Sequence, residues 1–529
     1  MPKVDNAIIL AAGTGSRFVP LTLEKPKGLV RVHGIPMIER QIEQLKECGI
    51  SEIIIVTGFL KEKFDYLAAK YHVTFVHNPA YARRNNLSSL YYARDYLKNS
   101  YILSSDNWMS ENIFHEYEER SWYSCVYNTG VTKEWCVTVD AEDRLQSVVV
   151  GGHDSWVMYG PVFFTEDFSR AFSPKIAEYY CKNGTENYMW ENVFIDEIKN
   201  PLFTLYINRQ NAQTVFEFES VDELRTFDSS WNGAAESRHL ALLCDLFSVH
   251  DYEITALHRV KEGMTNRSFS FCVHNTPYIF RVPGEGSNTL INRVQEKSCY
   301  DAVQQLGIMD KIVYFDTVRG EKISFYYEDA HNTCADNPQD VQDSCALLRT
   351  LHHSGICVAH TFDIGAEIAR YISLCIERNV INSVQYISMN ERLKPLVTTL
   401  QQMNINNALC HIDCNPDNFI RLKDGTLRLI DWEYAGMCDP LIDCAMYAIY
   451  SAYDEAAALS FLNVYLQRDA CAAEKMRLFG CMCLGGFLWA LWTEYKKSFG
   501  IEFGNYGSRM YRYTNTIIED FEHNKGVFA

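Results

Sequence analysis

Residues near the N-terminus have the types and spacing needed to hold a nucleoside triphosphate. A glycine-rich turn over residues 13–17 follows the apolar run Ile8-Ile9-Leu10 and precedes the dipeptide Pro26-Lys27. The backbone N–H groups of such a turn approach phosphate oxygens, and Arg17 and Lys27 would neutralise charge on a triphosphate. The turn has neither the third glycine of a dinucleotide-binding loop nor the Gly-Lys-Ser/Thr of a Walker loop. On the glycines alone, an ordinary strand-to-helix turn is an equally good interpretation.

A second group of residues, in the C-terminal half, contains the parts that phosphoryl transfer requires. Asp413 is followed five residues later by Asn418, and Asp431 ends the strand-like run 427–430. The reaction needs one carboxylate that faces the attacked hydroxyl and two oxygen ligands for magnesium. This spacing therefore predicts a site for phosphoryl transfer.

The elements around the first group alternate between short β-rich runs and helical patterns. The runs that we interpret as buried parallel strands are residues 7–10, 53–56, 74–76 and 101–103. Between them, Ile38, Ile42 and Leu45 recur at helical spacing. The alternation predicts a doubly wound α/β sheet. Asp106 follows the last run, and a carboxylate at the carboxyl end of a parallel strand is well placed to bind magnesium beside phosphates.

Length and composition set the domain organisation. The chain has 529 residues, 47% of them hydrophobic and 22% charged, which indicates a packed globular protein with more than one core. The polar stretch 229–239 is the best linker candidate, which gives an N-terminal domain over residues 1–228 and a C-terminal domain over 240–529. Strands near residues 269–273 and 278–282, followed by mostly helical patterns, predict an α+β fold for the C-terminal domain.

Net charge and cysteine spacing limit the cellular compartments and the binding partners that we expect. The net charge of −18 disfavours nucleic acid as a partner. The 18 cysteines lack paired metal or redox spacing, so reduced thiols in a cytoplasmic protein are expected. The longest apolar stretch, residues 478–492, is shorter than the roughly 20 residues that cross a membrane, and we interpret it as a buried helix. We therefore expect neither secretion nor membrane insertion.

The N-terminal string L-A-A-G-x-G-S-R-F-x-P-L-T-x-x-x-P-K-x-L-V resembles the signature of nucleotidyltransferases that act on sugar phosphates and aminoalcohol phosphates. The resemblance implies a Rossmann-like mixed sheet. It also implies that Arg17 and Lys27 are catalytic and that Asp106 binds magnesium. The residues implied to bind the nucleotide at the turn are Leu10, Ala12, Gly13 and Gly15.

Further motifs, including Ser89-Leu90-Tyr91, Glu134-Trp135 and Phe216-Glu217-Phe218-Glu219, are similar to those of bacterial CTP:phosphocholine cytidylyltransferases. This similarity implies that Asn86 and Ser89 lie near the base and ribose. It implies Glu219 as the second metal ligand, at a position where the family has aspartate. Trp135, Trp190 and Glu191 would form the cation site, since aromatic faces and a carboxylate hold a quaternary ammonium. Met189 stands where the family tends to have another aromatic residue.

In the C-terminal half, H-x-D-x-x-x-x-N followed by I-D-W-E-Y resembles choline kinases and aminoglycoside phosphotransferases, which have a protein-kinase-like fold. The resemblance makes Asp413 the catalytic base and Asn418 and Asp431 the metal ligands; His411 is interpreted as structural support of the loop. Other implied ATP-binding residues are Gly263, Thr265, Asn266, Arg281 and Glu296, the last paired with Arg281. Tyr434, Trp489 and Trp492 would wall the choline pocket.

Together the two resemblances imply one enzyme that phosphorylates choline with ATP and then converts phosphocholine and CTP into CDP-choline and pyrophosphate, with magnesium at both sites. Its partners would be these small molecules, whereas the oligomeric state stays open. The same two reactions on ethanolamine, an aminoalkylphosphonate or a sugar phosphate are an alternative. A further alternative is that one domain is a degenerate regulatory or binding module. The presence of Lys27, Asp106, Asp413, Asn418 and Asp431 argues against the latter.

Overall fold

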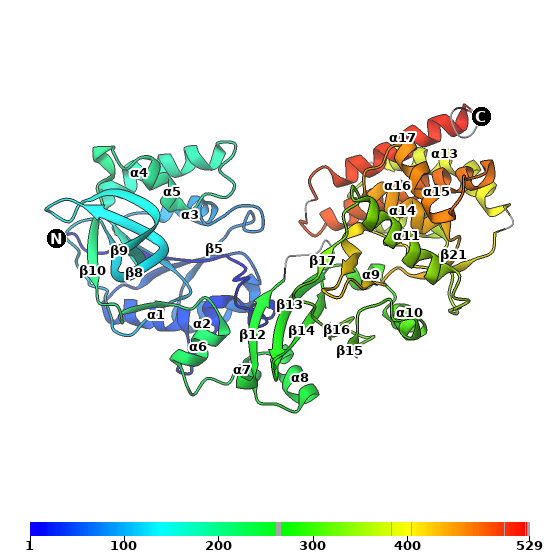
Figure 1. The fold of residues 1–529 in the computed structure, drawn as a ribbon. Coiled ribbons are helices and arrows are strands. Elements are labelled where there is room, and N and C mark those ends of the chain that lie inside the picture. The colour runs from blue at the N-terminus through cyan, green and yellow to red at the C-terminus, as the bar shows by residue number, and fades with distance from the viewer. Residues whose placement is uncertain (261–265, 382, 404, 502, 524, 526–529) are drawn as a thin grey trace. The chain divides into compact units, whose positions relative to one another are not determined.

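The computed structural model describes residues 1–260, 266–381, 383–403, 405–501, 503–523 and 525. The chain folds into two compact units (Figure 1). The first comprises Met1–Arg259 with Phe271–His274, and the second comprises Val260–Ser270 with Asn275–Ala529. Each unit has its own hydrophobic core residues.

The first unit contains a mixed seven-stranded sheet. Its strands are β1 (Asn6–Ala11), β4 (Glu52–Thr57), β5 (Thr74–His77), β6 (Ser100–Ser104), β8 (Trp122–Val139), β9 (Leu145–Phe164) and β10 (Tyr206–Gln210). They lie in the order β10-β8-β9-β6-β1-β4-β5. Strand β1 runs parallel to both β4 and β6, whereas β9 is antiparallel to β6 and to β8. The predicted strands and the predicted mixed α/β sheet are thus confirmed.

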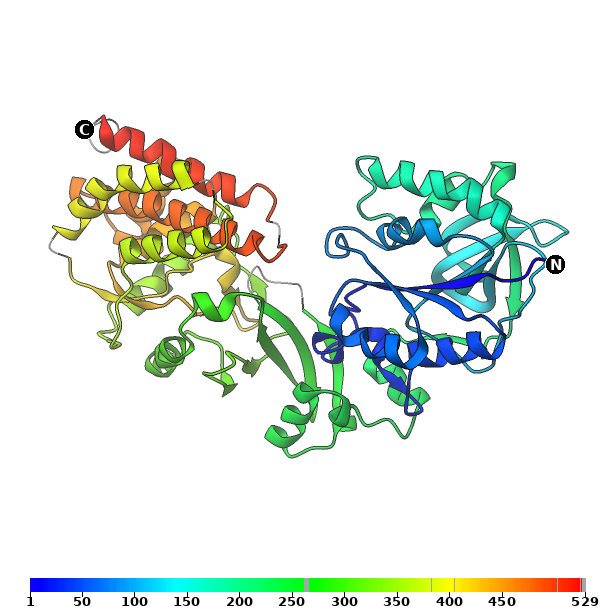
Figure 2. The same cartoon turned by 180° about the vertical axis from the view of Figure 1, so that it is seen from behind.

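Helices cover both faces of this sheet (Figures 1 and 2). They are α1 (Met37–Glu47), α2 (Tyr66–Tyr71), α3 (Leu87–Ala93), α4 (Glu166–Cys181) and α5 (Trp190–Asp196). On one face, Ile9 and Ile55 pack with Ile42 of α1; on the other, Ile54 packs with Ala93 of α3. Because successive residues of a strand point to opposite faces, a strand buried on both sides is apolar throughout. This explains the uninterrupted apolar runs of β1 and β4.

The first unit also contains smaller elements. They are η1 (Leu21–Leu23), η2 (Lys27–Leu29), β2 (Arg31–Val32), β3 (Ile35–Pro36), β7 (Asn107–Met109), β11 (Val215–Glu217), α6 (Val221–Phe227), α7 (Gly233–Glu236) and α8 (Arg238–Phe247). Strand β11 pairs antiparallel with β7, so that Glu217 lies opposite Asn107. The stretch 229–239, expected as a linker, carries α7 and the start of α8.

A five-stranded sheet follows along the chain. Its strands are β12 (Ile254–Arg259), β13 (Asn266–Val273), β14 (Thr276–Pro283), β15 (Ile312–Phe315) and β16 (Lys322–Phe325), in the order β12-β13-β14-β16-β15. Helices α9 (Ser287–Leu290) and α10 (Arg293–Val303) connect β14 to β15. Short strands come next, namely β17 (His331–Asn332), β18 (Ala408–Cys410), β19 (Phe419–Arg421), β20 (Leu427–Leu429) and β21 (Gly436–Cys438). The strands predicted near 269–273 and 278–282 are thus confirmed.

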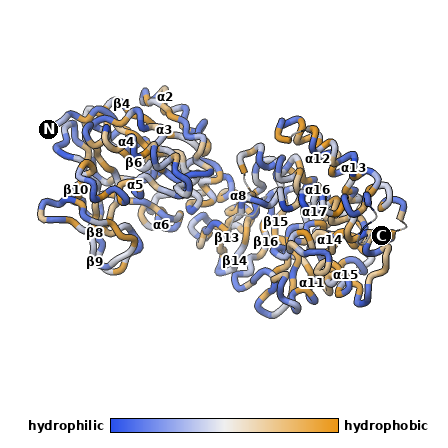
Figure 3. Tube along the Cα trace, turned by 90° about the horizontal axis from the view of Figure 1, so that it is seen from above, coloured by the Kyte–Doolittle hydropathy of each residue, from blue (hydrophilic) through white to orange (hydrophobic). Residues whose placement is uncertain are grey.

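The remaining elements of the second unit are helices. Its helices are α11 (Pro338–His352), α12 (Ile364–Glu377), α13 (Ser383–Gln401), α14 (Leu441–Tyr450), α15 (Glu455–Leu466), α16 (Ala472–Lys497) and α17 (Tyr506–Glu522). Helix α16 is the one described helix that is long and apolar enough to cross a membrane, but 89% of its apolar window is buried inside the unit. Its hydrophobic residues (Figure 3) pack with those of α14 in one core, as expected of a buried helix.

Candidate active sites

The glycine-rich turn of the first unit borders a cavity of about 710 Å³. Gly15 has φ +58, and a Cβ there would lie 2.9 Å from Thr22 and 3.0 Å from the Cβ of Lys27. Only glycine therefore lets the turn pack against the segment that carries Lys27. The predicted residues that line the cavity are Leu10, Ala12, Gly13, Gly15, Arg17, Lys27, Asn86, Ser89, Asp106, Trp190 and Glu191.

Two of the predicted residues lie outside the described lining of the nucleotide cavity. Trp135, on β8 opposite Val150, packs against a hydrophobic core, and Glu219 forms an ion pair with Arg17.

Lys27 and Asp106, which both line the cavity, form an ion pair. The Nζ atom of Lys27 lies 2.8 Å from Oδ2 of Asp106, whose other oxygen accepts a hydrogen bond from Ser104 at 2.7 Å. Burial alone would lower the pKa of Lys27, but the charge of Asp106 outweighs burial and raises this pKa above its ordinary value. Burial likewise opposes the effect of Lys27 on Asp106, whose pKa is lowered. Both groups are therefore charged at neutral pH.

Glu217 is a cavity residue that we did not predict. It lines the cavity, and its position opposite Asn107 brings it close to Asp106. Burial and the charge of Asp106 raise the pKa of Glu217 to about 7. The alternation of residues 214–219 was the available signal, because Glu217 and Glu219 are two residues apart and share a face of an extended strand.

Glu191 and Trp190 form another wall of the cavity. Glu191 accepts hydrogen bonds from the hydroxyl of Tyr123 at 3.2 Å and from the side-chain amide of Asn86 at 3.5 Å. Burial raises the pKa of Glu191 to about 7. The ring of Trp190 stacks on Tyr123 with a centroid distance of 5.9 Å. This wall therefore combines aromatic rings with a carboxylate, and sequence reasoning missed Tyr123.

In the second unit, Asp413 lies in a loop that connects β18 to the short helix η8 (Pro416–Asn418). Its carboxylate accepts hydrogen bonds from the hydroxyl of Tyr450 at 2.5 Å and from the side-chain amide of Asn418 at 3.0 Å. Burial is the main cause that raises the pKa of Asp413 to about 7. His411 is buried, and its Nε2 atom lies 2.9 Å from the carbonyl oxygen of Ile430. Its side chain thus contacts the backbone that leads to Asp431.

Arg281 is the centre of a buried charge network. Its Nη1 atom lies 2.5 Å from Glu296 and 3.2 Å from Asp431. Arg293, which we did not predict, lies 2.7 Å from the other oxygen of Glu296 and 3.2 Å from Glu433. Burial comes first among the effects on Glu296, but the two arginines outweigh it and lower the pKa of this carboxyl.

Asn266 joins the same region from β13, since its side-chain amide lies 3.5 Å from Glu433. Gly263 and Thr265, predicted to contact the phosphates of ATP, fall outside the described residues.

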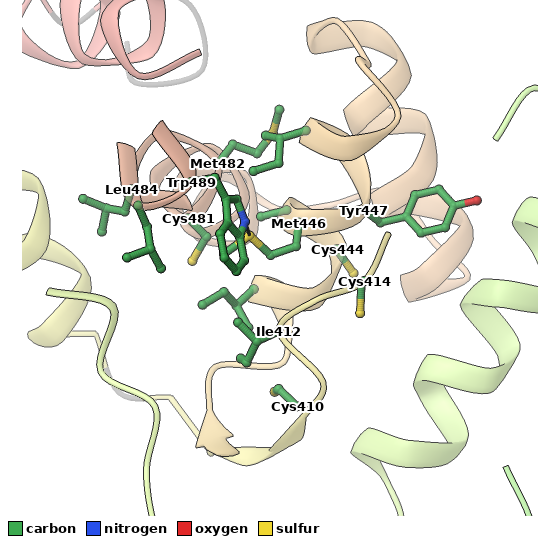
Figure 4. Packing of buried hydrophobic residues seen from close by; sticks show 14 of the residues in the cluster. Cys410, Ile412, Cys414, Cys444, Met446, Tyr447, Cys481, Met482, Leu484 and Trp489 are labelled. Carbon is green, nitrogen blue, oxygen red and sulfur yellow. Dashed lines mark hydrogen bonds between the residues drawn. The ribbon is translucent and has the colours of Figure 1, made fainter. Parts of the chain in front are cut away.

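Aromatic rings gather beside Asp413. The ring of Trp489 lies edge-to-face with Tyr434 at 5.1 Å and with Trp492 at 6.4 Å, and it is 6.0 Å from Tyr450. Trp489 and Trp492 are only 2% and 3% exposed. The indole N–H of Trp489 lies 3.2 Å from the sulfur of Met446 on α14 (Figure 4). Tyr506, which contacts Tyr450 and Trp492, was missed because it lies far away in the sequence.

Comparison with known proteins identifies both units. Residues 7–106 match the model of the MobA-like NTP transferase domain, and residues 257–479 match that of choline/ethanolamine kinases. Choline-phosphate cytidylyltransferase of Streptococcus pneumoniae is 37% identical over 223 residues, which are 42% of this chain and 96% of that protein. The 2-aminoethylphosphonate cytidylyltransferase of Lancefieldella rimae is 36% identical over 230 residues, or 43% of this chain and 93% of that protein.

For the second unit, protein LicA of Haemophilus influenzae is 27% identical over 271 residues, which are 49% of this chain and 99% of that protein. The expected protein-kinase-like fold of this unit is confirmed by the kinase match. The chain is therefore a two-domain enzyme: its N-terminal unit belongs to the MobA-like NTP transferases, in the group of the choline-phosphate cytidylyltransferases, and its C-terminal unit belongs to the choline/ethanolamine kinases.

Proposed function

We propose that the chain makes CDP-choline in two consecutive reactions. The kinase transfers the γ-phosphoryl group of ATP to the hydroxyl of choline and leaves ADP and phosphocholine. The cytidylyltransferase joins the phosphate of phosphocholine to the α-phosphorus of CTP and releases pyrophosphate. The product of the first reaction is the acceptor of the second, which is the reason to expect both domains in one chain.

One observation carries this proposal: both sites contain aromatic rings and a carboxylate beside the reacting groups. In the first unit these are Trp190, Tyr123 and Glu191, and in the second they include Tyr434 and Trp489 beside Asp413. A quaternary ammonium donates no hydrogen bond, so aromatic faces and negative charge are the groups that bind it. A pocket for a sugar would instead require several hydrogen-bonding side chains.

In the cytidylyltransferase, the attacking phosphate oxygen is already ionised, so the site needs charge neutralisation and positioning rather than a base. Lys27 supplies a fixed positive charge beside Asp106. The turn that contains Gly13 and Gly15 offers backbone N–H groups to the triphosphate, and Arg17 adds a second cation at its edge.

In the kinase, the attacking group is a hydroxyl, which must lose a proton. Asp413 accepts that proton, and Tyr450 and Asn418 hold its carboxylate in place. Arg281 contacts the phosphates of ATP while Glu296 holds the guanidinium in position.

The oxygen donors at both sites fit magnesium. Asp106 and Glu217 present two carboxylates to one cavity, and the raised pKa of Glu217 indicates a place where added positive charge is favourable. Glu219 is the alternative second ligand, although it is paired with Arg17. In the kinase, Asn418 and Asp431 are the ligands. Magnesium bound at these sites would neutralise charge on the nucleotide phosphates.

We propose a cytoplasmic location, where ATP and CTP are available, and small molecules as the partners. The 18 cysteines are all free thiols, which fits a reducing compartment.

The test is to incubate the purified full chain with magnesium, ATP, CTP and each acceptor in turn, and to follow products by phosphorus NMR. CDP-choline should form from choline only when both nucleotides are present, and from phosphocholine with CTP alone. Phosphorylation of ethanolamine in preference to choline would contradict the proposal.

A second candidate acceptor for the cytidylyltransferase is 2-aminoethylphosphonate, because a relative of that name is 36% identical to this unit. Met189, which lines the cavity and is 37% exposed, is compatible with this acceptor because it is not an aromatic residue. Faster cytidylyl transfer to 2-aminoethylphosphonate than to phosphocholine would favour it.

A further inference from the structure

The segment that follows the cytidylyltransferase sheet, residues 228–239, forms polar contacts with the loop that carries Lys27. Glu24 precedes Lys27 by three residues, and its carboxylate accepts a hydrogen bond from the hydroxyl of Ser237 at 2.7 Å. It also accepts from the backbone N–H groups of Arg238 at 3.0 Å and His239 at 3.1 Å, and it lies 2.5 Å from Nδ1 of the His239 ring. One side chain of the loop thus has four partners on residues 237–239.

Other residues of the loop also form polar contacts with this segment. Lys25 lies 2.5 Å from Glu236, and Arg31 lies 3.4 Å from the other oxygen of the same carboxylate. Farther along the loop, the backbone N–H of His33 donates to Asp228 at 2.6 Å. The loop is therefore held on both sides of Lys27 by residues 228–239.

The surroundings of Glu24 favour the charged form of its carboxylate. Burial alone would raise the pKa of Glu24, but the hydrogen bonds from His239 and Ser237 outweigh burial and lower the pKa to about 2. Glu24 also faces the first residues of α8, where the N-terminal end of the helix dipole favours a negative charge. The carboxylate is therefore charged and held at neutral pH.

The opposite side of the loop packs on the catalytic strand. A Cβ on Gly28 would lie 2.8 Å from the side chain of Ser105, next to Asp106. Lys27 itself reaches Asp106 at 2.8 Å. The loop thus lies between the carboxyl end of β6 and residues 228–239, and contacts both.

We propose that Glu236 and His239 are positioning residues for cytidylyl transfer, which hold Lys27 against Asp106 through Lys25 and Glu24. This inference rests on the proposed activity of the first unit. It means that the chain leading out of the transferase domain forms part of the support of its active site. It also assigns a role to residues that lie beyond the glycine-turn motif and have no contact with the nucleotide cavity.

The experiment compares His239→Leu, which removes the ring donor, with His239→Asn, whose amide nitrogen can replace Nδ1. Glu236→Gln tests the other contact, between Glu236 and Lys25. Each is made in the full chain, and kcat and KM are measured for CTP and phosphocholine. Asp245→Asn, an exposed change on α8, is the matched control.

We expect His239→Leu and Glu236→Gln to lower the transferase kcat by at least about tenfold, since a misplacement of ~1 Å can cost about 100-fold. The KM for phosphocholine should change less than kcat, and His239→Asn should recover most of the rate. The choline kinase rate of the same preparations should equal that of the control, which shows that the chain is folded.

A transferase kcat within twofold of wild type in both variants would overturn the inference. A lower melting temperature with unchanged kcat would overturn it as well, because it would show support of stability alone. If the wild-type chain transferred no cytidylyl group to any acceptor, the proposed function would fail, and the inference with it.

Discussion

The imidazole of His352 and the carboxylate of Asp443 form a buried ion pair, with Nε2 3.0 Å from Oδ2. The two oxygens of Asp443 also accept hydrogen bonds from the backbone N–H groups of His411 at 2.8 Å and Ile412 at 2.7 Å. Ile412 has φ +71, a conformation that a β-branched residue rarely adopts. The pair therefore holds the loop in the conformation that presents the next residue, Asp413.

Removal of this imidazole should impair the kinase. His352→Leu leaves the Asp443 charge buried without its cation, and loss of one partner of a buried pair costs about 3–5 kcal/mol. We expect a lower free energy of unfolding for the kinase unit and a slower phosphorylation of choline. Denaturant unfolding and kinase assays measure both. Cytidylyl transfer from supplied phosphocholine is the control, and equal loss of the two activities would contradict a local role.

The same pair predicts a pH dependence of stability. Burial would lower the pKa of His352, but the hydrogen bond to Asp443 outweighs it and raises the pKa to about 10. In the unfolded state the pKa of a histidine is about 6.5. Because the pKa of His352 is higher in the folded state, protonation of this side chain stabilises the fold, and the full stabilisation is present at pH values below about 6.5. This stability is lost as the pH rises through about 10. The difference in melting temperature between wild type and His352→Leu should therefore shrink between pH 7 and pH 11; a constant difference would contradict the assignment.

The two active sites should be separable by mutation. Lys27→Ala removes a charge aimed at the transferring phosphate and should lower cytidylyl transfer by roughly 100-fold or more while phosphocholine accumulates. Asp413→Ala removes the kinase base, so choline is not phosphorylated while supplied phosphocholine is still converted. A mixture of the two variants should restore CDP-choline synthesis from choline. Failure of the mixture, with both proteins folded, would show that the halves depend on each other.

The two glutamates near Asp106 should differ in importance. Glu217 lines the cavity, whereas Glu219 is paired with Arg17 at its edge. We expect Glu217→Gln to raise the magnesium concentration required for half-maximal cytidylyl transfer more than Glu219→Gln does. Magnesium titrations of the two variants measure this. The reverse order would make Glu219 the second ligand.

The indoles of the kinase should set its preference for choline. Cation–π contacts contribute about 0.5–2 kcal/mol each. Trp492→Leu should therefore reduce the ratio of kcat/KM for choline to that for ethanolamine by about 2- to 30-fold. Trp492→Phe keeps an aromatic face and is the control. An unchanged ratio in Trp492→Leu would exclude this ring from the acceptor site.

The parts of the sites that could be predicted from the sequence are those that lie close together along the chain. The turn with Gly13 and Gly15 and the segment from Asp413 to Asn418 each combine spacing with residue type. Long-range partners such as Tyr450 for Asp413 carry no such local signal, because packing of α14 against the loop brings them together. Glu24 and His239 are likewise separated by more than two hundred residues. For Trp135, the residue type suggested a binding role, whereas in the structure its ring packs against a hydrophobic core.

The indoles of α16 also have a consequence for how this enzyme can evolve. Trp489 contacts Met446 in the hydrophobic core of its unit and is only 2% exposed. A substitution that adapted this position to a new acceptor would also disturb the fold, so natural selection must find compensating changes in α14 at the same time. Met189 at the cytidylyltransferase cavity is 37% exposed, so its substitution should disturb core packing less. Acceptor choice should therefore diverge sooner among descendants in the cytidylyltransferase than in the kinase.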